Sequence, residues 1–450
     1  MISLVSKINN KIHGSELATK VFNALLGSAG IQILWMGLGF LVGVQLARGL
    51  GVESYGMYSI IMSIVAMMSL PIEFGIPQLT VREVAKANAK CQWDKFKGIL
   101  IWSNRIVISV FILLLLGLLT LMWLNLSFLE DPEIYQTILY GVILVPFISL
   151  MRIRGAALIG IQKIVMGQTP DVVLRPLFFS IALFVIFNIL EIESSPSSAM
   201  FLQLCSVVLV FLITVALLKI NSPVDLSKIT PYIQAKKWWW SSLPMALTES
   251  MRVLQGHLSL LILGLFISLN DVAIFKVAVS ISALIAMPIS LITIVSSSII
   301  SDLYTKGEFK KLAKLAQIMA ILMLLGVSAL VLPFVFFGEE LITWVFGDGY
   351  AESAQILLII CVGHLINAFF GINSTLLNMT KHEKRVMRAF IYSVFINVIL
   401  AVTLIYYQGI IGAALANTLA LVVWNVLMWY DAKKLLSINS TAWLNRNKNV

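Results

Sequence analysis

Long runs of apolar residues recur along the whole chain, separated by short segments that carry most of the charges. Each run reaches roughly 20 residues or more, the length at which an α-helix crosses the hydrocarbon core of a bilayer. A backbone inside lipid must satisfy its own hydrogen bonds, so the runs predict helices. Twelve spans are predicted. They are 25–47, 55–74, 98–124, 133–161, 170–190, 199–218, 243–267, 272–299, 315–337, 354–377, 389–407 and 411–430.

The composition strengthens this interpretation. Hydrophobic residues make up 59% of the chain and charged residues only 12%, too few charges to cover a soluble protein of this size. The three cysteines, Cys91, Cys205 and Cys361, follow no spacing typical of a disulfide framework or a metal site. The first 20 residues lack the compact apolar region and cleavage site of a signal peptide.

The distribution of lysine and arginine predicts the orientation in the membrane. Basic residues gather in 86–97, 306–314, 381–388 and 433–448, whereas the loops on the opposite side are short and acidic. Because cytoplasmic loops carry the excess of basic residues, we expect both termini on the cytoplasmic side. The net charge of +10 therefore follows from topology and requires no nucleic-acid partner, and a basic inner face suits anionic lipids.

The two halves of the chain resemble each other at a constant offset. Asp271 follows Glu53 by 218 residues, and "LLNMTK" at 376–381 follows "LIGIQK" at 158–163 by the same interval. Two six-helix lobes in the same orientation are therefore predicted, related by a pseudo-two-fold axis along the membrane normal, as in transporters that bind substrate between repeats. The predicted divisions are a cytoplasmic segment 1–20, a first lobe 21–220, a linker 221–240, a second lobe 241–431 and a cytoplasmic tail 432–450.

Some charged residues fall inside the predicted spans, where each is costly unless it is paired or faces water. Glu249 and Arg252 are three residues apart, so they share a helix face with Gln255. The group is either a structural ion pair or part of a polar passage. Glu249 is the one carboxylate expected clearly within a span, which makes it the candidate for H⁺ or Na⁺ coupling.

The cations inside the spans are all arginine, although the chain has 22 lysines and ten arginines. Arginine stays protonated when partly desolvated and grips phosphate with two parallel hydrogen bonds. The pattern predicts a cavity, open to the cytoplasm, that receives a phosphate or diphosphate. The embedded arginines are Arg252, Arg152, Arg154, Arg105 and Arg175, and Arg48 and Lys276 at outer span ends complete the candidate substrate-binding set.

Further polar residues in the spans leave two interpretations open. His257 and His364 each lie in a "GHL" triplet, and an intramembrane histidine is either a hydrogen-bonded packing residue or a proton relay. Asparagines of the second half, Asn417 among them, either join neighbouring helices or bind sugar hydroxyls.

Signatures of several catalytic classes are missing from the sequence. No GxxxxGK[ST] phosphate-binding loop occurs, and neither does HExxH or GxSxG. The longest predicted outer loop, 338–353, has only sixteen residues. We therefore expect a transporter and not an enzyme, without a metal or an organic cofactor.

Two motifs identify a family. "ARGLGVESYGMYS" at 47–59 is followed by "EFGIPQLTVREVA" at 73–85. With these motifs the chain resembles the Wzx-type O-antigen and polysaccharide flippases, a branch of the multidrug/oligosaccharidyl-lipid/polysaccharide exporter superfamily. One departure is that Phe275–Lys276 replaces a family glycine and places a charge at an outer helix end. The gate candidates, for which a static structural role is the alternative, are Glu53, Tyr55, Gly56, Arg82 and Glu83 within the motifs and Asp271 at the position that matches Glu53 in the second half.

The resemblance implies a MATE-like, all-α fold and a function. The cargo would be an undecaprenyl-diphosphate-linked O-antigen or similar oligosaccharide, moved across the bacterial inner membrane for lipopolysaccharide or other polysaccharide biosynthesis. A polysaccharide polymerase and a chain-length regulator would be partners. Alternatives remain: a cation-coupled multidrug antiporter would need embedded acids, a lipid II flippase usually has more than the twelve spans predicted, and a glycan polymerase would show a large outer loop.

Overall fold

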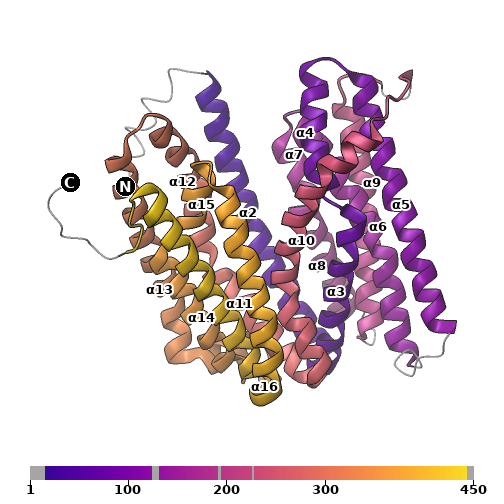
Figure 1. The fold of residues 1–450 in the computed structure, drawn as a ribbon. Coiled ribbons are helices and arrows are strands. Elements are labelled where there is room, and N and C mark those ends of the chain that lie inside the picture. Colours follow the sequence, from indigo (N-terminus) through magenta and orange to yellow (C-terminus); the bar gives the residue numbers. More distant parts are fainter. Residues whose placement is uncertain (1–15, 124–130, 191–193, 226–227, 443–450) are drawn as a thin grey trace.

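The computed structural model describes residues 16–123, 131–190, 194–225 and 228–442. Nearly all of these residues lie in helices and none lies in a strand, which confirms the predicted all-α class (Figure 1). The first half contains α2 (Glu16–Leu50), α3 (Val52–Glu73), α4 (Ile76–Ala89), α5 (Trp93–Trp123), α6 (Pro132–Gly160), α7 (Ile164–Thr169), η2 (Pro170–Leu174), α8 (Arg175–Phe184), η3 (Val185–Ile189) and α9 (Pro196–Asn221). The second half contains α10 (Ala235–Phe266), α11 (Leu269–Ile285), α12 (Met287–Thr305), α13 (Phe309–Phe346), η5 (Asp348–Tyr350), α14 (Ser353–Phe370), α15 (Asn373–Met379) and α16 (Glu383–Leu436).

Large apolar side chains cover the outside of these helices. Leu113, Leu212, Phe336 and Tyr407 are between 60% and 80% exposed, an arrangement that is unfavourable in water but matches a hydrocarbon environment. Among the described residues, ten helical segments are long and apolar enough to cross a membrane. The chain is therefore a multi-pass membrane protein.

The helices follow the predicted spans with differences at three places. The predicted span 354–377 is divided at Gly371, with a φ of 76°, into α14 and α15. The predicted span 272–299 is divided at Ala286 into α11 and α12, because Pro288 lies in the first turn of α12 and proline, which has no N–H, suits a helix start. The last two predicted spans both lie in α16, which bends at Gly409 with a φ of 58°, a left-handed value that glycine adopts readily. The count of twelve stays a prediction.

The helices form two lobes, seen as two bundles in Figure 1. α3 to α9 belong to one bundle and α11 to α16 to the other. The first helix of each half contacts both bundles: α2 packs on α7, η2 and α8 as well as on α11 and α12, and α10 packs on α3 and α4 as well as on α11 and α16. α2 and α10 therefore form the walls between the lobes.

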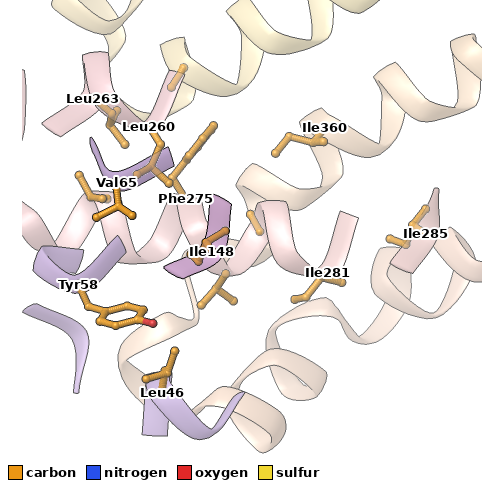
Figure 2. Packing of buried hydrophobic residues seen from close by; sticks show 14 of the residues in the cluster. Leu46, Tyr58, Val65, Ile148, Leu260, Leu263, Phe275, Ile281, Ile285 and Ile360 are labelled. Atoms are coloured by element: carbon orange, nitrogen blue, oxygen red, sulfur yellow. The ribbon is translucent and has the colours of Figure 1, made fainter. Parts of the chain in front are cut away.

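Apolar packing joins the lobes. Figure 2 shows Tyr58 and Val65 of α3 in the same cluster as Leu263 of α10, Phe275 of α11 and Ile360 of α14. All five side chains are at most 5% exposed. The cluster fixes the rotation of α3, α10 and α11 and so determines which of their polar residues face inward.

One end of the interface between the lobes is tightly closed. A β-carbon at Gly56 of α3 would overlap the carbonyl oxygen of Leu269 at the start of α11, so this backbone contact requires glycine. Tyr350 Oη donates a hydrogen bond to the Ala47 carbonyl over 3.0 Å, and its ring lies edge-on to Tyr55 at 6.3 Å between centroids. In the predicted topology this is the outer end.

Candidate functional site

A cavity of about 500 Å³ lies between the lobes. Residues of α2, α3, α6, α8, α9, α10 and α11 line it, so most of its wall comes from the first half of the chain. Four cations contribute to the wall: Arg152, Arg175, Arg252 and Lys276. No carboxylate occurs among the described residues that line the cavity. An arrangement with this sign of charge favours an anionic ligand.

A chain of ion pairs behind the cavity wall orients two of the cations. Arg152 Nη1 of α6 lies 2.9 Å from Glu73 Oε1 at the end of α3, and Arg152 Nε lies 2.9 Å from Asp171 Oδ2. Arg175 Nη1 approaches Asp171 Oδ1 to 3.2 Å. Ser149 Oγ adds a long contact of 3.5 Å to Glu73. The guanidinium groups are thus held by carboxylates from α3 and η2, at the edge of the cavity.

The local backbone explains how Asp171 reaches both arginines. Pro170 cannot donate a backbone hydrogen bond, and the helix widens into the π-helical turn η2 from this residue. Asp171 and Arg175 are four residues apart and share one face. Glu73 is only 5% exposed. Both carboxylates lie at the ends of predicted spans, where sequence alone suggests a solvated interface, so their ion pairs were not predicted. That Glu249 is the one acid clearly within a span stays a prediction.

Arg252 and Glu249 form the ion pair expected from their spacing on α10. Arg252 Nη2 contacts Glu249 Oε1, and Arg252 Nε lies 3.1 Å from the same oxygen. Gln78 of α4 donates a hydrogen bond of 3.3 Å to Glu249 Oε2. The Arg252 side chain is 69% exposed, whereas that of Glu249 is 21% exposed. Arg252 is therefore free to move toward a ligand while Glu249 stays anchored.

Lys276 differs from the three arginines. It lies on α11 and lines the cavity beside Ser280 and Tyr55. Within the described residues, the Lys276 ammonium group makes no ion pair or hydrogen bond, while each cavity arginine has a carboxylate partner. A cation without a counter-charge in a partly buried cavity is the strongest local attraction for an anion. The residue that departs from the family pattern thus supplies the uncompensated charge.

Neutral polar groups complete the wall. His257 Nδ1 lies 3.1 Å from Ser63 Oγ of α3, and Tyr58 Oη donates a hydrogen bond to Gln203 Oε1 of α9. Both contacts join helices that line the cavity. The hydrogen bond of His257 corresponds to the packing role considered for the intramembrane histidines.

Three arginines from the predicted substrate-binding set lie elsewhere. Arg154 donates to the Leu150 carbonyl over 2.9 Å, and its guanidinium lies 4.8 Å from the Phe211 ring centroid. Arg105 is exposed on α5 and lines neither cavity described here. Arg48 donates to the carbonyls of Val345, over 2.7 Å, and Trp344. Trp344 and Val345 lie in the last turn of α13, where the backbone carbonyls have no helical partner and attract cations. Gln255 lines a separate, smaller cavity.

The gate candidates separate into two groups. Tyr55 and Gly56 are buried at the closed end, where Glu53 and Asp271 lie in the first turns of α3 and α11; Asp271 pairs with Ser268 Oγ at 2.8 Å. These residues contact the opposite lobe or flank such contacts.

Arg82 and Glu83 instead interact within α4, 3.1 Å apart, and Lys86 Nζ lies 2.9 Å from Glu83. Burial acts to raise the pKa of the Glu83 carboxyl, but hydrogen bonds and charges from Lys86 and Arg82 outweigh it and hold the pKa below its usual value. Their ion pairs are local to one helix and do not join the lobes.

Two models of known protein families match this chain. The model of the family described as "Polysaccharide biosynthesis protein" matches residues 26–303, which include all four cavity cations. The chain belongs to this family. The MatE model also matches residues 244–403. The resemblance to polysaccharide flippases of the exporter superfamily, predicted from the two N-terminal motifs, is thereby confirmed.

Individual proteins are similar to this chain over most of its length. A "Probable flippase AglR" of Haloferax volcanii is 23% identical over 407 residues, covering 88% of this chain and 80% of the relative. An inward-facing multidrug resistance MATE family transporter of the MOP superfamily superimposes with a TM-score of 0.74 at 16% identity, covering 90% of this chain and 94% of the other. The lipid II flippase MurJ, in an inward closed conformation, gives a TM-score of 0.65 at 16% identity, covering 91% and 87%. The solved structures confirm the MATE-like, two-lobed fold.

Proposed function

We propose that this protein is a flippase, not an enzyme, and that it moves an undecaprenyl-diphosphate-linked oligosaccharide, of the O-antigen type or similar, from the cytoplasmic to the outer leaflet of the bacterial inner membrane. The observation that carries the proposal is the cavity between the lobes, whose wall has four cations and no described carboxylate. A diphosphate is the part of such a cargo that a cationic cavity recognises most strongly. The matching family and the flippase relative support the same class of cargo.

The cations of the cavity have different roles in this proposal. Arg152 and Arg175 are held rigidly by Glu73 and Asp171, so they provide a fixed positive surface. Lys276 supplies a charge without a carboxylate partner among the described residues. Arg252 can turn from Glu249 toward the diphosphate, because most of its side chain is exposed.

Transport would follow alternating access, with the lobes rocking about the bound head group while the lipid tail stays in the bilayer. Contacts such as Tyr350 to Ala47 close the predicted outer end and would separate in the outward-open state. Coupling to H⁺ or Na⁺ is proposed at Glu249, because neutralising this carboxylate would release Arg252. A polymerase and a chain-length regulator would take up the cargo outside. No resident metal or cofactor is part of the proposal.

Two related functions are compatible with the fold alone. The MATE neighbour and the MatE family match fit a cation-coupled multidrug antiporter, and the MurJ neighbour fits a lipid II flippase. The antiporter is disfavoured by the sign of charge on the cavity wall. Lipid II carries the same diphosphate, so a cargo assay must separate it from other lipid-linked sugars.

The test is a proteoliposome assay that measures exposure of fluorescent polyprenyl-diphosphate oligosaccharide on the far leaflet. Wild-type protein is compared with Arg252→Ala, Arg252→Lys and Lys276→Ala. The matched controls are Arg388→Ala and Lys314→Ala, two exposed cations outside the cavity. We expect Arg252→Ala and Lys276→Ala to reduce transport at least tenfold, Arg252→Lys to restore part of it, and both controls to behave as wild type.

Each contrary result has a defined meaning. Export of cationic dyes without movement of the lipid would replace the proposal by the antiporter. Transport of lipid II but of no other lipid-linked sugar would establish the lipid II flippase. Normal transport by both Arg252→Ala and Lys276→Ala would show that neither of these two cations binds the cargo and would overturn the roles proposed for them.

A further inference from the structure

A second cavity, of about 270 Å³, lies in the second half of the chain between α10, α14 and α16. This volume corresponds to about nine water molecules at about 30 Å³ each, enough space for one sugar ring. Its polar wall is formed by Gln255 of α10, His364 of α14, and Asn417 and Thr418 of α16. It is distinct from the cationic cavity in position and in chemistry.

The wall of this smaller cavity suits a neutral, hydroxyl-rich ligand. The amides of Gln255 and Asn417 can both donate and accept hydrogen bonds, and Thr418 Oγ1 donates to the Ile359 carbonyl over 3.0 Å, which leaves its lone pairs as acceptors. Ile360 and Leu421 add apolar surface, against which the C–H face of a sugar ring packs well. Carboxylates are absent from the described lining, and Arg252 is its only charged residue.

One polar atom in this wall lacks a partner. His364 Nδ1 is buried and forms no hydrogen bond in the described structure. Leaving a buried polar atom unsatisfied destabilises a fold, so such atoms usually meet a ligand or ordered water. A ligand contact accounts for the unsatisfied nitrogen, whereas the hydrogen-bonded packing role considered for the intramembrane histidines does not.

The two cavities adjoin along α10. Arg252 and Gly256 line both of them. A β-carbon built at Gly256 meets no atom within 4 Å, so open space surrounds this position. In a lipid-linked oligosaccharide the first sugar is bonded directly to the diphosphate. A sugar site must therefore border the phosphate site, and Arg252 stands at that border.

We propose that the cavity between α10, α14 and α16 is a sugar subsite. It binds the first sugar of the lipid-linked oligosaccharide through hydrogen bonds from His364, Asn417 and Gln255, while the diphosphate lies among the cations of the larger cavity. The inference rests on the proposed function and extends it: helices of the second half select the sugar, whereas cations from both halves bind the phosphates.

The experiment measures binding of three fluorescent short-chain prenyl diphosphates to the purified full-length protein in detergent. One probe carries a hexose, one an N-acetylhexosamine, and one no sugar. The variants are His364→Leu and Asn417→Leu. The matched control is Asn378→Leu, which makes the same amide-to-alkyl change at an exposed position of α15. Thermal melts establish that each variant is folded.

Wild-type protein should bind at least one sugar-bearing probe more tightly than the sugar-free probe. We expect His364→Leu and Asn417→Leu each to weaken that binding about fivefold, which is about 1 kcal/mol, and to leave the sugar-free probe unchanged. Asn378→Leu should match wild type for all three probes. Equal binding of all probes by wild-type protein would overturn the subsite but not the phosphate site. If wild type binds none of them, the proposed function itself fails.

A second variant keeps the inference testable if the leucine variants fail to fold. Gly256→Val adds an isopropyl group to the surface shared by the cavities, where the backbone has room for a side chain. The sugar-bearing probe should lose its advantage over the sugar-free probe. Unchanged discrimination in Gly256→Val would contradict the proposed placement of the sugar beside the diphosphate.

Discussion

Glu73 provides the sharpest test of how the cavity is built. Replacing it with glutamine removes one negative charge but keeps the size and a hydrogen-bond acceptor. Glu73 Oε1 lies 2.9 Å from Arg152 Nη1, and the side chains are 7% and 31% exposed. Breaking a buried ion pair by removing one partner typically destabilises a protein by about 3–5 kcal/mol. Arg152 keeps its ion pair with Asp171, and glutamine still accepts a hydrogen bond. We therefore expect Glu73→Gln to lower the free energy of unfolding by about 2 kcal/mol.

The comparison variant is Glu249→Gln, which makes the same change at the Arg252 pair. The Arg252 side chain is 69% exposed, and pairs of this kind contribute about 0–1 kcal/mol. Titration with SDS in mixed micelles measures the free energy of unfolding of both variants. Glu73→Gln should be the more destabilising by at least about 1 kcal/mol. Equal destabilisation, or a larger effect in Glu249→Gln, would refute the reasoning from burial.

The Glu73→Gln substitution also changes the charge beside the cavity. Without Glu73, the positive charge of Arg152 is only partly neutralised, so a phosphate ligand is held more tightly. Binding of a sugar-free prenyl diphosphate should strengthen in Glu73→Gln and should depend more steeply on salt. Weaker binding in a folded variant would show that the orientation of Arg152 matters more than its net charge.

Two further predictions concern the closed end of the interface between the lobes. Arg48→Ala removes the hydrogen bonds to the Val345 and Trp344 carbonyls. It should increase severalfold the thiol labelling of a cysteine placed at Ala47, which is buried and keeps its carbonyl for Tyr350; unchanged labelling would mean that Arg48 does not hold the lobes together. Gly56→Ala places a methyl group against the Leu269 carbonyl. It should either open the same end, seen as increased labelling, or lower the melting temperature by several degrees. The control Gly256→Ala, at a position with room for a methyl group, should do neither.

Much of the architecture was predictable from the sequence, because the bilayer imposes a minimum length on each apolar helix. The predicted boundaries lie within a few residues of α3, α6 and α9. The i,i+3 pair of Glu249 and Arg252 was also predictable, since it depends only on helical periodicity within α10. The motif at 47–59 correctly indicated the family.

The site needed the tertiary structure. The link from Glu73 to Arg152 joins residues 79 positions apart, and it depends on how α3 and α6 rotate against each other, which packing decides. Arg154 is two residues from Arg152 on the same helix, yet it turns to Phe211, because positions i and i+2 lie on different faces. The positions of the arginines within apolar spans predicted that they lie inside the membrane, but not which of them line one cavity.

Lys276 shows the same division most clearly. The sequence alone identified a charge at an outer helix end and included it in the candidate substrate-binding set, but it did not show that the ammonium group has no carboxylate partner among the described residues. Only the packing of α11 against α2 and α3 turns that side chain into the cavity. Chain length, hydrophobicity and local spacing therefore determined which segments cross the membrane, whereas side-chain packing between distant helices decided which charges face a ligand, because helix rotation is a property of the assembled core.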